Sequence, residues 1–246
     1  MERYHNIYRS LAALLLAGSF LSCGASVDMR FGTDRSLAIS LGLEVPEAVD
    51  AKLRQFVASA LPGSGSGTAP LFNAEAIAES LRVRGALVRS STMPTPRSYS
   101  GKLDIVDIER LLISEQELGS VLQYTRGPGW ASIRVQADRG NASTVLDLFP
   151  GLDGDLIEAL QPPALYDNPV SPAEYRSMLS GLLGRAAATA MDGMLFVLSA
   201  SFPGTILEAS DGVTLDLSKR VARFSIPALD AMVLEKPIVF YIKWIE

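Results

Sequence analysis

Histidine and cysteine are nearly absent from this chain of 246 residues, in which His5 and Cys23 are the only examples. Ser-His-Asp and Cys-His active sites need an imidazole to take the proton of the nucleophile, and zinc sites draw mainly on the same two residue types. Neither arrangement can be assembled from the sequence beyond residue 23. A single cysteine also leaves no partner for a disulfide. We therefore expect no catalytic triad, no metal and no cofactor.

Positive charge is also scarce. Beyond residue 22 the chain has 20 Lys and Arg against 26 Asp and Glu, a net charge of about −6, which disfavours nucleic acid as a partner. Residues 63–67 (GSGSG) lack the Lys-Ser/Thr ending of a phosphate loop, and residues 153–155 (DGD) lack the full ligand series of a calcium loop. We interpret the first as part of a flexible connection at about 62–70 and the second as acids at a helix start.

One apolar run stands out, at residues 11–24 (LAALLLAGSFLSCG). Arg3 and Arg9 precede it, which is typical of a secretory leader. Its apolar core of about a dozen residues falls short of the roughly 20 that a helix needs to span a bilayer. We therefore predict a signal peptide at residues 1–22 rather than a permanent membrane span.

The end of this run, Ser22-Cys23-Gly24, resembles the lipobox of bacterial lipoproteins. The match is relaxed, as in spirochaetal lipoboxes, because Phe20 stands where a small aliphatic residue is usual. The resemblance implies cleavage before Cys23, a diacylglyceryl group on its thiol, and a cell-envelope protein anchored at a periplasmic face or at the outer surface. The alternatives are a plain signal peptide with a cysteine near its cleavage point, or a buried structural cysteine.

Alternating apolar residues and turn signals predict strands, several of them joined as hairpins. These strands are expected at residues 27–31, 37–43, 83–90, 99–106, 120–125, 130–136, 194–201, 206–209, 213–217, 221–226 and 237–244. Helices are expected at 46–61, at 73–81 with Asn73 as N-cap, at 107–112, at 141–149 with Asn141 as N-cap, at 152–160, and from a Ser171–Glu174 capping box onward. The sequence therefore predicts an α+β fold: a mostly antiparallel sheet built from hairpins, covered by a long helix (about 172–191) and shorter helices, in a single domain at 23–246.

The helix predicted at about 172–191 contains Gly181, Gly184 and a run of alanines at 186–188 where it should face the sheet. Small residues there indicate either close packing or a pocket between helix and sheet. A pocket at a membrane would suit a lipid or another apolar ligand, and nearby arginines would suit its anionic head. The alternative interpretation of these arginines is that they form the solvated face of a strand. The candidate ligand-binding residues are Tyr175, Met178, Leu182, Arg82, Arg84 and Arg89.

Two further features carry a resemblance to a family: a hairpin at 27–43 directly after the cysteine, and the turn at 202–206 (FPGTI) leading to Gly212. Together they resemble bacterial lipoproteins of the LppM-like kind, although Phe224 stands where that family tends to carry Trp. The resemblance implies an α+β envelope domain with a lipid-related role. Our hypothesis is a membrane-anchored, non-catalytic protein with a binding or structural role. The alternatives are a surface adhesin and a carboxylate-based hydrolase, with Asp104, Asp107 and Glu109 as candidate acids.

Overall fold

The computed structural model describes residues 24–60, 70–147, 157, 160–166 and 169–246. The strands are β1 (Gly24–Phe31), β2 (Leu37–Glu44), β3 (Leu87–Thr95), β4 (Ser98–Ile105), β5 (Leu122–Gly127), β6 (Trp130–Ala137), β7 (Leu195–Ser201), β8 (Ile206–Ala209), β9 (Thr214–Leu215), β10 (Val221–Pro227) and β11 (Ile238–Ile245). The helices are α2 (Glu47–Ala60), α3 (Ala74–Val83), α4 (Ile108–Ser114), the 3-10 helix η2 (Gln116–Ser120), α5 (Ala142–Asp147), α7 (Pro172–Leu183), α8 (Arg185–Asp192) and α9 (Ala228–Val233).

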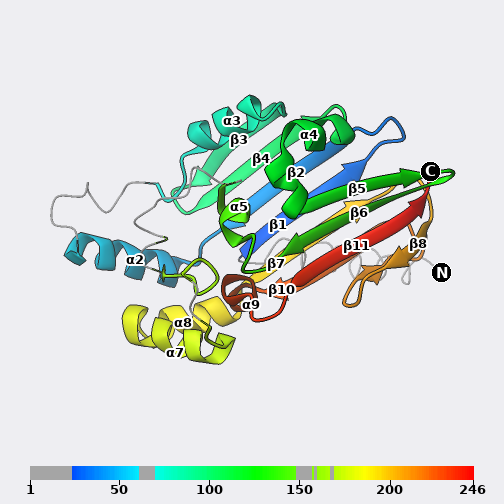
Figure 1. The fold of residues 1–246 in the computed structure, drawn as a ribbon. Helices are drawn as coiled ribbons and strands as arrows, with labels where there is room; N and C mark the ends of the chain where they lie inside the picture. Colours follow the sequence, from blue (N-terminus) through cyan, green and yellow to red (C-terminus); the bar gives the residue numbers. More distant parts are fainter. Residues whose placement is uncertain (1–23, 61–69, 148–156, 158–159, 167–168) are drawn as a thin grey trace, which may run out of the picture.

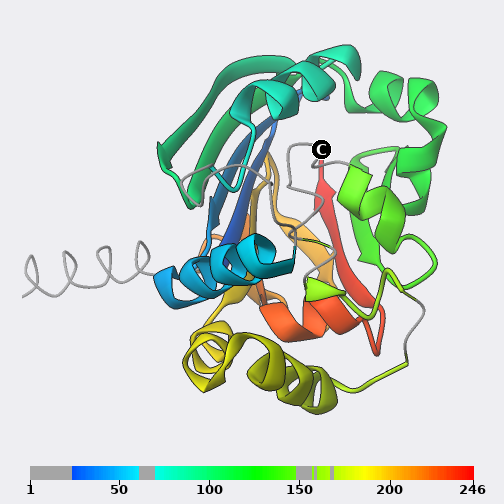
Figure 2. The same ribbon diagram turned by 90° about the vertical axis from the view of Figure 1, so that its left-hand side faces the viewer.

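The strands form two sheets, which confirms the α+β class. One sheet has seven strands in the order β3-β4-β2-β1-β7-β10-β9, and the other has four in the order β5-β6-β11-β8 (Figure 1). Among the described pairs only β1 and β7 run parallel, with Gly24 opposite Leu195; the others are antiparallel. Figure 2 shows the two sheets facing each other.

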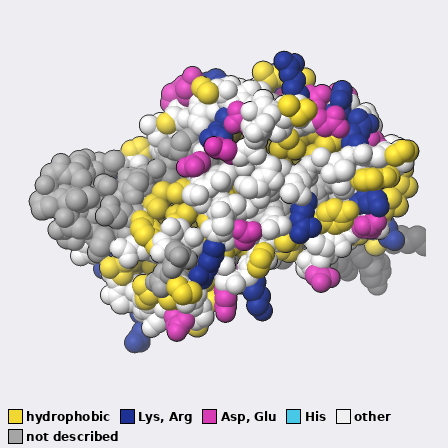
Figure 3. All heavy atoms as spheres, in the orientation of Figure 1, with side chains coloured by type: hydrophobic (Ala, Val, Ile, Leu, Met, Phe, Trp, Pro, Cys, Tyr) yellow, Lys and Arg dark blue, Asp and Glu magenta, His cyan; other side chains and the backbone are white. Residues whose placement is uncertain are grey.

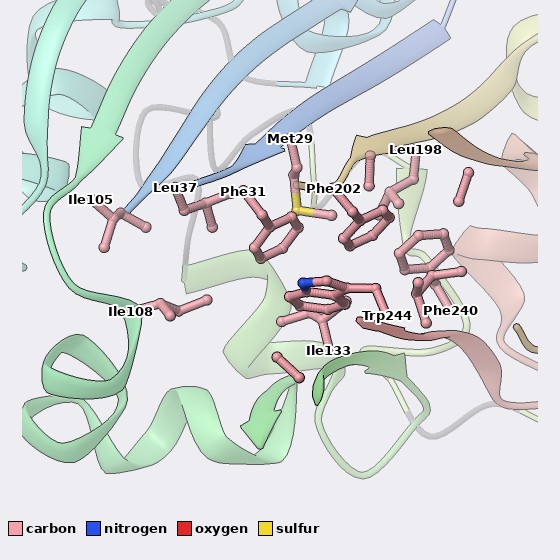
Figure 4. Close-up of a cluster of buried hydrophobic side chains, with 14 of the residues drawn as sticks. Met29, Phe31, Leu37, Ile105, Ile108, Ile133, Leu198, Phe202, Phe240 and Trp244 are labelled. Atoms are coloured by element: carbon pink, nitrogen blue, oxygen red, sulfur yellow. The ribbon is translucent and has the colours of Figure 1, made fainter. Parts of the chain in front are cut away.

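The main core lies between these sheets, because each contributes the apolar side chains of its inner face. Phe31 of β1 stacks on Phe202 with ring centroids 5.1 Å apart, and Trp244 of β11 packs on Phe202 at 4.6 Å (Figure 4). Trp244 is 1% exposed, and its indole Nε1 has no hydrogen-bond partner among the described residues. The aromatic contacts therefore join the sheets at the cost of one buried, unpaired donor.

The hairpins expected at residues 27–43 and 120–136 are confirmed as β1–β2 and β5–β6. The hairpin at residues 83–106 differs from its prediction in two ways. Residues 83–86 end α3 and turn instead of starting a strand. The expected long loop is wrong, since β3 continues to Thr95 opposite Ser98 and leaves only Pro96 and Arg97 at the tip.

The long helix expected at about 172–191 is two helices, because Gly184 between α7 and α8 adopts φ 86°, a left-handed value that ends a helix. α8 folds back along α7, and Arg176 near the start of α7 binds Asp192 at the end of α8 through both carboxylate oxygens, at 2.6–2.9 Å. The predicted capping box of Ser171 and Glu174 is confirmed.

The expectation that this helix covers a sheet is wrong. α7 packs with α2, α8 and α9 around a second apolar cluster, which includes Leu53, Tyr175, Met191 and Val233. We call the end of the sheets where these four helices gather the helical end (Figure 1).

The two predicted asparagine caps have different outcomes. The side chain of Asn73 accepts a hydrogen bond from the Ala76 N–H and caps α3, as expected. Asn141 instead lies buried, where its Nδ2 donates to the carbonyl oxygens of Ser120 and Gln136. It therefore ties the start of α5 to η2 and β6, and a side chain used in this way does not cap the helix that follows it.

Candidate functional site

The candidate site begins with Gly24, the first residue of β1 and the residue that follows Cys23. Gly24 is buried and lies between two strands, opposite Glu44 of β2 and Leu195 of β7. Its φ is 146°, and a Cβ at this position would overlap the carbonyl oxygen of Leu195. The backbone here therefore requires glycine. Since adjacent Cα atoms are about 3.8 Å apart, the Cα atom of Cys23 is within about 3.8 Å of a residue that is held between two strands.

Gly24 lies at the helical end. Glu44, opposite Gly24, is followed by α2, and Leu195, on its other side, is preceded by α8. Pro227 lies opposite Leu195 in β10 and leads directly into α9. The turn at residues 32–36 and the C-terminus lie at the opposite end of the strands (Figure 1). An anchor on Cys23 would therefore place the helical end against a membrane.

The three candidate ligand residues of α7 are placed differently from one another. Tyr175 is fully buried, its hydroxyl donates to the carbonyl oxygen of Leu160 at 2.7 Å, and burial raises the pKa of its phenol well above the usual value. Met178 and Leu182 are one helical turn apart and are 46% and 44% exposed. Tyr175 is therefore part of the apolar cluster between the helices, whereas Met178 and Leu182 are exposed on the surface of the helical end.

The candidate arginines lie elsewhere and are paired. Arg82 binds Glu75 and Glu79 at 3.2 Å each, Arg84 approaches Glu115 at 3.4 Å, and Arg89 binds Asp104 at 2.7 Å. These pairs are partly or well exposed and contribute little to stability, but they neutralise the cations. The structure does not bring the arginines together with α7, because α3 and α7 lie at opposite sides of the molecule in both Figure 1 and Figure 2.

The candidate acids of the hydrolase hypothesis are also engaged by arginines. Asp104 binds Arg89, whereas Asp107 and Glu109 share Arg35 at 3.3 and 3.0 Å. Asp107 also caps α4 by accepting from the Arg110 N–H. Two carboxylates held by one guanidinium do not form the open acid–base pair that glycosidic cleavage requires. The face in Figure 3 likewise shows cations and acids interspersed.

Several predicted features lie outside the described residues: the leader and Cys23, most of the connection at 62–70, and the acids at 153–155. Within the described part of the chain, no cluster of three His, Cys, Asp or Glu residues is arranged to hold a metal ion. No helix in that part combines the length and the apolar character needed to cross a membrane.

Sequence reasoning missed a groove of about 630 Å³ beside β10 and β11, whose lining includes Phe224, Ile226, Pro227, Ile238 and Val239. Each strand was predicted correctly. The groove exists because β8 and β9 pair with only part of β11 and β10. The alternation of residues along one strand carries no information about how much of it a neighbouring strand covers.

No protein-family model matches the sequence, and no curated protein matches it. Among solved structures, the chain is similar to the NMR structure of the folded domain of the LppM protein from Mycobacterium tuberculosis, with a TM-score of 0.39 and 8% sequence identity over 91% of each chain. LppM is the kind of protein that the sequence motifs resemble.

Proposed function

We propose that this protein is a lipid-anchored component of the bacterial cell envelope, held at a membrane through Cys23, with a non-catalytic binding or structural role. The observation that carries the proposal is the position of Gly24. The leader predicted from the sequence ends at Ser22, before Cys23, and β1 begins at Gly24. Gly24, which is paired on both sides, therefore directly follows the predicted lipidation site, Cys23.

The direct bond between Cys23 and the first residue of β1 would fix the orientation of the domain at the membrane. Because Gly24 is fixed between β2 and β7, a lipid on Cys23 holds the domain close to the bilayer in one orientation instead of on a flexible tether. The exposed Met178 and Leu182 on α7 then lie on the side that faces the lipid. Several acyl chains on one residue make the attachment lasting, since each buried methylene contributes about 0.8 kcal/mol.

The anchor is tested by Cys23→Ala, with Ser22→Ala as the matched control because alanine keeps a small residue before the cysteine. The alanine variant of Cys23 should take up no radiolabelled palmitate and should leave the detergent phase of a Triton X-114 separation. Ser22→Ala should behave as the wild type. Unchanged partitioning of Cys23→Ala would contradict the proposal. Protease accessibility on intact cells distinguishes a surface adhesin from a protein displayed at a periplasmic face.

A further inference from the structure

The groove beside β10 and β11 lies where both sheets have a strand edge that is only half covered. β9 pairs with β10 through Ala222 and Arg223 alone, and β8 pairs with β11 only from Ile242 to Trp244. Within the described residues, the rest of each edge has no neighbouring strand. The uncovered halves, at the end of β10 and the start of β11, both line the groove.

On β10 the backbone groups that point into the open side belong to Ser225. Phe202 donates its N–H to the carbonyl oxygen of Arg220 at 2.9 Å, so Arg220 and every second residue after it are paired with β7. The residues between them point the other way, and Asp216 N–H accordingly donates to Val221. The same alternation directs the N–H and C=O of Ser225 outward, and no described residue pairs with them.

On β11 the corresponding residue is Val239. Ser210 donates its N–H to the carbonyl oxygen of Tyr241 at 2.9 Å. The backbone N–H and C=O of Tyr241, and therefore those of Val239 two residues earlier, point to the β8 side of the strand. The Ser210 hydroxyl donates to the carbonyl oxygen of Val239 at 3.1 Å. The Val239 N–H has no partner among the described residues. The groove thus offers two backbone donors and a backbone acceptor to whatever enters it.

The chemistry of the groove favours one kind of occupant. Phe224, Ile226 and Ile238 are half-buried and apolar, and exposed charged side chains surround them. The charged residues of the lining are Asp211, Asp230, Glu235 and Lys236. Three acids against one cation attract positive charge and repel an anionic headgroup. An acyl chain would also leave the backbone donors unpaired and remove them from water, which is costly.

We propose that this groove binds an extended peptide segment that adds as a strand to the edge of β10. The segment pairs with the N–H and C=O of Ser225, places apolar side chains towards Phe224 and Ile238, and presents Lys or Arg to the acidic rim. Alternation of apolar and basic residues meets both requirements, because successive side chains of a strand point to opposite faces.

The test uses the full chain in phosphatidylcholine nanodiscs and a fluorescently labelled hexapeptide that alternates valine and lysine, with empty nanodiscs as the blank. Polarisation should show saturable binding that weakens with salt. A peptide alternating valine and glutamate should not bind. The variant carrying Asp230→Asn and Glu235→Gln should bind the lysine peptide more weakly, with a smaller salt dependence. Equal binding of the basic and acidic peptides would overturn the charge argument.

The backbone contact is tested by Ser225→Pro, which removes the outward N–H, against Ser225→Ala, which keeps it. Proline is tolerated at edge positions, and Pro227 already occupies the next outward position of β10. We expect about tenfold weaker binding for Ser225→Pro than for Ser225→Ala. If Ser225→Pro unfolds, N-methylation of the peptide amides tests the same pairing on the wild-type chain. Equal affinity of methylated and unmethylated peptides, or displacement of the peptide by oleate, would assign the groove to a different ligand.

Discussion

Inserting a flexible linker of about 20 Gly and Ser residues between Cys23 and Gly24 is expected to release the domain from its fixed orientation at the membrane. β1 has eight residues, so its two ends lie about 23 Å apart at about 3.3 Å per residue. Such a linker reaches about 25 Å on average, which is comparable to the height of the domain. The native chain should therefore hold one end near the lipid, and the variant with the linker should not.

The assay uses the lipid on Cys23 to advantage, because its thiol is then blocked and one introduced cysteine becomes the only site for a dye. Ala48→Cys at the helical end and Thr33→Cys at the opposite turn are both exposed positions. In vesicles containing an acceptor lipid, energy transfer should be strong from position 48 and weak from position 33, and the linker should make the two similar. Equal transfer from both positions in the native chain would refute the reasoning, whereas absence of vesicle binding would instead refute the lipid anchor.

Trp244→Ala should cost about 3–5 kcal/mol of unfolding free energy in urea titrations followed by circular dichroism. Trp244→Phe should cost clearly less, because it removes an unpaired buried N–H worth about 1–3 kcal/mol; equal losses would contradict this. Ser171→Ala should lower stability by about 1 kcal/mol through the lost cap of α7, and no change would show that α7 does not depend on it. Hydrogen bonds from the Ser218 hydroxyl and then the Val221 N–H lower the pKa of Asp216 to about 2. This carboxylate therefore contributes stability above its unfolded pKa of 3.8 that is lost as the pH falls towards 2, and Asp216→Asn should show a smaller fall in melting temperature over that range. Chelators and reducing agents should leave the melting temperature unchanged, and a drop of several degrees with EDTA would reveal a metal held by carboxylates.

The features that could be predicted from the sequence depend on residues close together in the chain. Asn73 caps α3 and the Ser171–Glu174 box starts α7, because both motifs satisfy free amides within one helical turn. The hairpins follow in the same way from two alternating runs and the turn between them. Phe240, Ile242 and Trp244 alternate along the strand predicted at 237–244, and all three are buried on one face of β11.

The features that were missed depend on which distant segments meet. β7 pairs in parallel with β1 across about 170 residues of sequence, and nothing in either strand specifies that partner. The sequence around Gly184 indicates either close packing or a pocket within one long helix, but the left-handed φ of Gly184 makes it the turn between two helices. Once the chain reverses there, α7 meets α2 and α9 instead of a sheet. The candidate ligand residues of α7 therefore do not lie over the sheet, where the prediction placed them.

The anchor and the groove are connected through the sheet. Gly24, Leu195 and Pro227 lie opposite one another in β1, β7 and β10. Neighbouring strands are about 4.8 Å apart, so the groove wall at Pro227 lies about 10 Å from Gly24. Exposed strand edges normally invite unwanted pairing and are covered or shortened. Here β8 and β9 cover the edges only away from the helical end. With the proposed anchor on Cys23, the domain would not turn this open edge towards a second copy in solution, and the peptide segments within its reach would be those that lie close to the membrane surface.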